Sequence, residues 1–123
     1  MSVALLTNIV SPTPVSLSGG ICFATTIVPA GTAAYSINAQ TSQVICPSNE
    51  LRTAVTWTLP KASTCPGLQM SLVNKSLTAV ITLATTGGDY LPSYLSPPTI
   101  PVSTGPGNDQ FYYFESDGIN TWQ

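Results

Sequence analysis

The sequence predicts an all-β protein, an antiparallel β-sandwich of the jelly-roll kind in one domain spanning residues 1–123. Apolar and polar residues alternate with a period of two in its clearest segments, which is the pattern of a half-buried strand. The 11 Pro and nine Gly divide the chain into short runs, as in sandwiches and barrels. Only residues 48–52 would fit a helix, and they allow a single turn. No repeat of fixed length is visible, so a long β-helix of identical coils is not expected.

The expected strands are clearest in the second half of the chain. Residues 53–59 place Val55, Trp57 and Leu59 on one face, with Thr between them. Residues 68–72 repeat this alternation, and residues 80–84 are almost continuously apolar, as in a strand covered on both faces. Weaker candidates precede them at residues 3–10, 15–26, 33–38 and 42–46.

A Pro-rich segment, residues 90–109, follows these strands and predicts a long loop. Its five prolines cannot donate backbone hydrogen bonds to a sheet and favour extended conformations. Long loops of this kind often carry function or hold a neighbour. Its apolar side chains either pack back onto their own sandwich or contact a second subunit. The candidate interface residues are Tyr90, Leu91, Tyr94, Leu95 and Ile100.

A C-terminal hairpin is expected after the loop. Asp117-Gly118 predicts a two-residue type I′ turn, in which both residues need a positive φ. Such a turn puts Tyr113 opposite Trp122, with Phe111 on the same face. Both faces of the hairpin are then apolar, so the second face needs the Pro-rich loop or a neighbouring subunit as its cover. The residues expected to hold the hairpin are Phe111, Tyr113, Asp117, Gly118 and Trp122.

Composition excludes several classes of function. Charged residues make up only 7% of the chain and the net charge is −2, whereas ordinary soluble domains hold about 25% charged residues. The three basic residues, Arg52, Lys61 and Lys75, form no stripe for nucleic acid or anionic lipid, and no apolar run is long enough to span a membrane. We therefore expect neither nucleic acid nor a membrane as a partner. A surface with so few charged residues is suited to a subunit that packs among neighbouring subunits.

No enzymatic activity, metal or cofactor is expected. The chain has no His, which removes Ser-His-Asp triads and His-based metal sites. Among the acids, Asp89, Asp109 and Asp117 lie in turn contexts that already explain them. The spacing of Cys22, Cys46 and Cys65 matches no zinc pattern, which leaves buried thiols or one disulfide with a spare cysteine.

Four short motifs occur in a fixed order between residues 56 and 122. They are Thr56-Trp57-Thr58-Leu59-Pro60, a Gly67-led strand ending in Asn74, the turn Gly87-Gly88-Asp89, and Asp117-Gly118-Ile119-Asn120-Thr121-Trp122. This order resembles a β-module of virus particles, found in phage tail and fibre proteins and in minor surface proteins of large DNA viruses. The resemblance covers residues 51–123 and leaves residues 1–50 as additional strands or an anchor.

The resemblance implies a structural protein located in the virion, as a capsid decoration, a spike or fibre subunit, or a minor capsid component. Its partners would be further copies of itself, with a trimer favoured by analogy with viral surface proteins, and other capsid or tail proteins. The alternative is a carbohydrate-binding or adhesin module that attaches to a host glycan. In that case Tyr90, Tyr94 or Trp122 would stack on sugar rings.

Overall fold

The computed structural model describes residues 24–123. The strand expected at residues 3–10, most of that expected at residues 15–26, and Cys22 lie outside this range.

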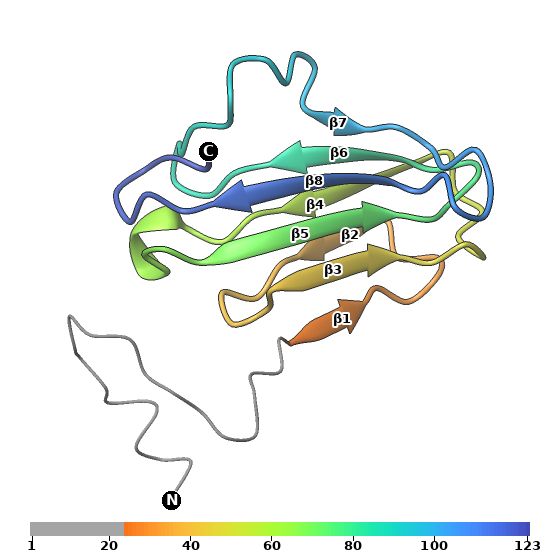
Figure 1. Ribbon diagram of the computed structural model, residues 1–123, viewed down its shortest axis with the longest axis horizontal. Helices are drawn as coiled ribbons and strands as arrows, with labels where there is room; N and C mark the ends of the chain where they lie inside the picture. The colour runs from red at the N-terminus through yellow and green to blue at the C-terminus, as the bar shows by residue number, and fades with distance from the viewer. Residues whose placement is uncertain (1–23) are drawn as a thin grey trace, which may run out of the picture.

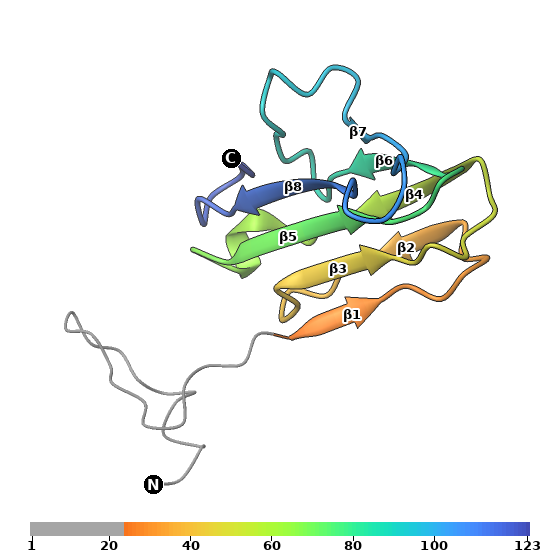
Figure 2. The same cartoon turned by 45° about the vertical axis from the view of Figure 1, so that its right-hand side comes forward.

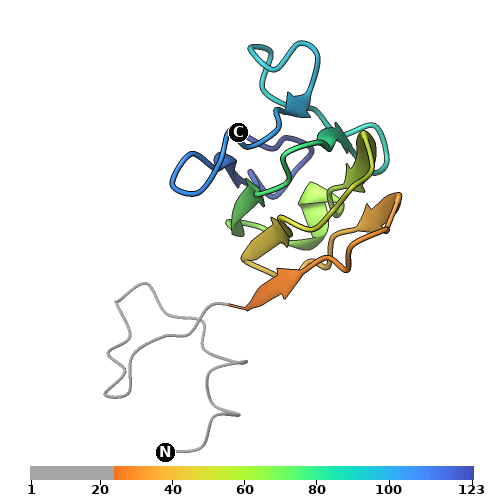
Figure 3. The same cartoon turned by 90° about the vertical axis from the view of Figure 1, so that its right-hand side faces the viewer.

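The described chain is all-β, with eight strands and one short 3₁₀ helix, η2 (Ala62–Thr64). The strands form two mixed sheets of four, stacked as two layers (Figures 1 and 3). Sheet A holds, in spatial order, β1 (Thr25–Ile27), β3 (Gln43–Cys46), β5 (Gln69–Asn74) and β8 (Gln110–Glu115). Sheet B holds β2 (Ala34–Ser36), β4 (Ala54–Thr58), β6 (Val80–Ala84) and β7 (Thr99–Ile100).

From β1 to β6 the chain alternates between the two sheets and winds as a short, two-sided coil. Each strand pairs in parallel with the strand two places later, β1 with β3 and β3 with β5, and likewise β2 with β4 and β4 with β6. The turns of the coil are unequal, because Thr25 pairs with Gln43 whereas Gln43 pairs with Ser71. Unequal turns leave no fixed repeat in the sequence.

The parallel pairing corrects the antiparallel, jelly-roll expectation. A period of two arises in any strand with one covered face and does not reveal the direction of its neighbours. Parallel neighbours require a crossover, which is usually a helix. Here a strand of the opposite sheet provides that crossover. Among the strands of residues 24–123, antiparallel ladders occur only where β8 joins β5 and β7 joins β6, at one end of the coil (Figure 2).

The core lies between the sheets, and the alternation in the sequence identifies it well. Val55 and Trp57 of β4 point inward, as do Met70 and Leu72 of β5. In β6 the expectation of cover on both faces is wrong, because Thr82 is exposed between buried neighbours. The largest fully buried side chains are Trp57, Trp122, Phe114, Leu59, Met70, Leu72, Ile81, Ile100 and Val44.

Candidate functional site

The C-terminal turn is wider than the two-residue turn expected at Asp117-Gly118. Ser116 forms an isolated antiparallel bridge with Trp122, so the residues between them form the loop. Of the turn pair, only Gly118 has a positive φ, +77°. The carboxylate Oδ1 of Asp117 accepts hydrogen bonds from the backbone N–H groups of Ile119, Asn120 and Thr121 at 2.8, 3.0 and 3.0 Å. These bonds stabilise a wider loop than local turn preference predicts.

The carboxylate of Asp117 is held in its charged form by this loop. The backbone N–H of Thr121 lowers the pKa of Asp117 most, followed by that of Ile119. Hydrogen bonds to the charged form favour ionisation. The acid is therefore a structural element of the turn, as the sequence context indicated.

The predicted pairing of Tyr113 with Trp122 is wrong. Trp122 is fully buried, whereas Tyr113 and Phe111 lie on the outer face of sheet A and are 54% and 64% exposed. Trp122 and Gln123 instead form backbone hydrogen bonds with two separate segments, one at Tyr90 and one at Glu115. Trp122 N donates to the carbonyl oxygen of Tyr90 at 2.9 Å, and Gln123 N donates to that of Glu115 at 2.9 Å. The wider loop moves Trp122 past Tyr113 and into the core.

The Pro-rich segment separates into buried and exposed residues. Leu95 and Ile100 are buried in the core of their own chain, and Leu91 packs against it. Leu95 and Ile100 offer no surface to a partner in this fold and Leu91 is only partly exposed, so the five candidate interface residues do not form one patch. Tyr90 and Tyr94 remain 63% and 76% exposed.

The Pro-rich segment also contains β7, which pairs with β6. The number of prolines had predicted no strand in this segment. In Figure 1 the connection from β6 to β7 rises away from the two sheets.

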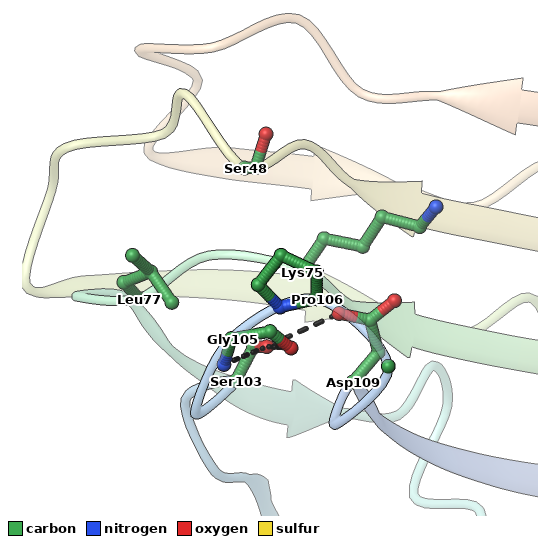
Figure 4. A pocket seen from close by; sticks show the side chains of 8 residues that line it. Ser48, Lys75, Leu77, Ser103, Gly105, Pro106 and Asp109 are labelled. Carbon is green, nitrogen blue, oxygen red and sulfur yellow. Dashed lines mark hydrogen bonds between the residues drawn. The ribbon is translucent and has the colours of Figure 1, made fainter.

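A depression of about 370 Å³ lies beside this segment and is lined in part by Lys75, Ser103 and Asp109 (Figure 4). Ser103 is buried, with its Oγ 3.1 Å from Asp109 Oδ1 and accepting a hydrogen bond from Gly105 N at 3.2 Å. Figure 4 shows the amino group of Lys75 pointing away from Ser103. The serine hydroxyl therefore holds its own turn and has the Asp109 carboxylate, not the Lys75 amine, beside it, so this depression lacks the geometry of a Ser-Lys dyad.

A buried polar network connects the ends of several strands, and little in the sequence pattern predicts it. Asn74 is fully buried. Its Nδ2 donates to the carbonyl oxygens of Ala79 and Pro101 at 2.8 and 2.9 Å, and its Oδ1 accepts from Ser76 N at 3.0 Å. Ser76 Oγ donates to the carbonyl oxygen of Glu50 at 2.9 Å. The tripeptide Asn74-Lys75-Ser76, formally a glycosylation sequon, thus serves the interior of the fold.

Glu50 belongs to the same region and is also structural. Its side chain is only 3% exposed and accepts from Gly31 N at 2.6 Å and from Arg52 N at 2.9 Å. The hydrogen bond from the backbone of Arg52 is the main cause of its lowered pKa, and burial opposes it. Glu50 N donates to the carbonyl oxygen of Pro47 at 3.1 Å, so the turn that begins at this proline is the sequence signal for the position of Glu50.

The described cysteines are buried thiols. Cys46 and Cys65 are free and almost fully covered. Burial, with a smaller effect of the charge on Glu50, raises the pKa of Cys46 to about 11. Such a thiol is inert at neutral pH because the thiolate is the reactive form. Within residues 24–123, no group of three or more side chains of the metal-binding types comes together.

Comparison of the chain with protein-family models, with curated proteins and with solved structures gave no match. The class that the described residues define is an all-β protein of two mixed four-stranded sheets. Among residues 24–123, no helix has the length and apolar character needed to cross a membrane.

Proposed function

We propose that this protein is a structural subunit of a virus particle, as a capsid decoration, a spike or fibre subunit, or a minor capsid component. The distribution of charge carries this proposal. All eight charged residues lie within the described range, and only Glu115 is part of a strand. The charged groups thus surround the sheets in the connections and leave the outer faces almost neutral. Depletion of charge is characteristic of the centres of protein interfaces.

The outer face of sheet B is the surface best suited to assembly. Its side chains are small and uncharged, so a neighbouring sheet can approach to the ordinary packing distance of about 10 Å. Small side chains also lose little conformational freedom when they are covered. This face consists of Ala34, Ser36, Ala54, Thr56, Thr58, Val80, Thr82 and Ala84.

The proposed assembly is a homo-oligomer, with a trimer favoured by analogy with the symmetry of viral surface proteins. Tyr94, exposed on the Pro-rich segment, adds a large aromatic contact beside the sheets. Other capsid or tail proteins are the remaining partners in this proposal. It involves no catalysis, nucleic acid or membrane, in keeping with the absent His and the few basic residues.

Two measurements test the proposal. Native mass spectrometry of the purified protein should give an oligomer at micromolar concentration, and Thr56→Lys in the centre of the sheet B face should shift it towards monomer. Ser48→Lys, on an exposed turn, is the matched control and should leave the mass unchanged.

The second measurement tests the place in a virus particle. Protein mass spectrometry of purified virus particles should detect the chain. A monomer at all concentrations together with its absence from particles would overturn the proposal.

The second candidate function is the carbohydrate-binding or adhesin module. Of the three aromatic residues expected to stack on sugars, Trp122 is buried and only Tyr90 and Tyr94 are exposed. The exposure of Tyr90 and Tyr94 is the observation that favours this candidate. A saccharide-binding screen with Tyr90→Ala and Tyr94→Ala variants tests it, since unchanged binding in both variants would remove these residues from the site.

A further inference from the structure

A shallow groove crosses the outer face of sheet A, and Tyr113 is the one residue of its lining that the sequence marked as a candidate. Its volume is about 400 Å³. The groove opens over β5, which lies between β3 and β8 in the sheet (Figure 1). Its lining consists of Thr25, Ser42, Gln43, Gln69, Ser71 and Tyr113. From this geometry and chemistry we propose that the groove is a binding site for a neutral carbohydrate.

Cross-strand register explains why a groove forms here. Gln43 pairs with Ser71, and Ser71 pairs with Tyr113, so these three side chains form one row across three strands. The short side chain of Ser71 is the floor, between the longer side chains of Gln43 and Tyr113. Neighbouring strands are about 4.8 Å apart, which places the two walls about 10 Å from each other. A single sugar ring fits between walls at this separation.

The lining matches the two chemical faces of a neutral sugar. The ring of Tyr113, 54% exposed, offers an aromatic surface against which the C–H groups of a pyranose can pack. The amides of Gln43 and Gln69 each offer a donor and an acceptor, which is what a sugar hydroxyl needs. Thr25 Oγ1 donates to Gln43 Oε1 at 3.2 Å, which leaves the NH₂ group of that amide as the donor for a ligand.

The same lining disfavours other ligand classes. None of the six residues is charged, so nothing in the groove compensates the charge of a phosphate or a sulfated sugar. A wholly apolar ligand would leave the two glutamine amides without partners. The next row across the sheet is apolar and consists of Ile27, Ile45, Val73 and Phe111. A second copy of the chain seated on that row would cover the groove, and the experiment must distinguish this outcome.

The test is a screen of the purified full-length chain against an array of neutral saccharides, followed by titration calorimetry with the saccharide that binds. Tyr113→Ala should weaken binding about tenfold or more, because the stacking surface is lost. Tyr113→Phe should retain most of the affinity, and Gln69→Ala should reduce it. Leu51→Ala, which truncates an exposed large apolar side chain outside the groove, is the control and should bind like the unaltered protein. Tyr94→Ala tests the other candidate sugar-binding position, on the Pro-rich segment.

Three results would overturn the site. The first is the absence of binding to any neutral saccharide, and the second is a loss of binding in Tyr94→Ala but not in Tyr113→Ala. The third is a change of oligomeric mass in Tyr113→Ala, which would assign this face to a second copy. Melting temperatures of all variants establish that each one is folded. The inference is independent of the proposed place in a virus particle, because particle mass spectrometry and saccharide binding can each succeed or fail alone.

Discussion

The indole nitrogen of Trp122 donates a hydrogen bond to the carbonyl oxygen of Pro60 at 3.1 Å, across 62 positions of sequence. Trp122 is thereby fixed to the connection between β4 and η2. The same side chain is fully buried. Trp122 is thus an integral part of the core.

Trp122→Ala should be among the most destabilising single substitutions in the described chain. Removing a fully buried tryptophan typically costs about 3 to 5 kcal/mol of unfolding free energy, and here it also leaves the Pro60 carbonyl without its partner. Thermal and denaturant unfolding measure the loss. Phe111→Ala, an aromatic truncation on the exposed face of β8, should change stability little and is the control. An unchanged melting temperature for Trp122→Ala would contradict the docking.

Gly118→Ala should destabilise the protein for two separable reasons. Gly118 has φ +77°, which other residues rarely adopt, and an added Cβ would lie 2.9 Å from Pro66 Cβ. Gly88→Ala isolates the backbone effect, since Gly88 has φ +78° and open space around it. We expect a cost of about 1 kcal/mol for Gly88→Ala and a larger cost for Gly118→Ala. Equal unfolding free energies for the two variants would contradict the steric contact.

Stability should fall in acid because the pKa values of Glu50 and Asp117 are lower in the folded protein than in the unfolded chain. Their carboxylate forms therefore favour folding. This contribution is complete above the unfolded pKa of about 4 and is lost as the pH falls through the folded pKa. Melting temperatures from about pH 7 to about pH 2 measure it. The double variant Glu50→Gln with Asp117→Asn should show a smaller decline, and a decline equal to that of the unaltered protein would contradict this origin.

Asn74→Ala should be costly despite its polar character. The substitution leaves the carbonyl oxygens of Ala79 and Pro101 and the N–H of Ser76 without this partner. Each buried polar group that loses its hydrogen bond costs about 1 to 3 kcal/mol, so we expect a loss of at least about 2 kcal/mol. Asn49→Ala, at an exposed turn position, is the control. Denaturant unfolding that shows equal stability for the two variants would contradict the network.

Cys46 and Cys65 should not react with a thiol reagent in the folded protein at neutral pH, because both are buried and the pKa of Cys46 is raised to about 11. The measurement uses a Cys22→Ser variant, so that only these two thiols report. Addition of denaturant should release both. Rapid labelling of either thiol under native conditions would contradict the buried environment.

The positions of most strands could be predicted from the sequence because burial on one face imposes a period of two. Val55 and Trp57, and likewise Met70 and Leu72, point into the core as their alternation with polar residues predicts. The long loop expected at residues 90–109 is found in part, because β7 interrupts it and Leu95 and Ile100 fold back into the core.

The C-terminal turn shows the limit of local rules. Asp117-Gly118 is a strong two-residue turn signal, yet the carboxylate of Asp117 binds three successive backbone N–H groups and widens the loop. The wider loop lets Trp122 reach the core. A hydrogen-bonded loop combined with the burial of a large aromatic outweighs the preference of a dipeptide.

By itself the sequence determined the all-β class, the faces of the main strands and the scarcity of charge, because each of these follows from local composition and periodicity. Only the tertiary structure decided which strands are neighbours and in which direction they run. A period of two is the same in parallel and antiparallel strands, and the unequal turns of the coil leave no repeat to reveal the pairing. Gln43, Ser71 and Tyr113 lie in one row only because β3 and β8 both pair with β5. No local sequence pattern predicts that row.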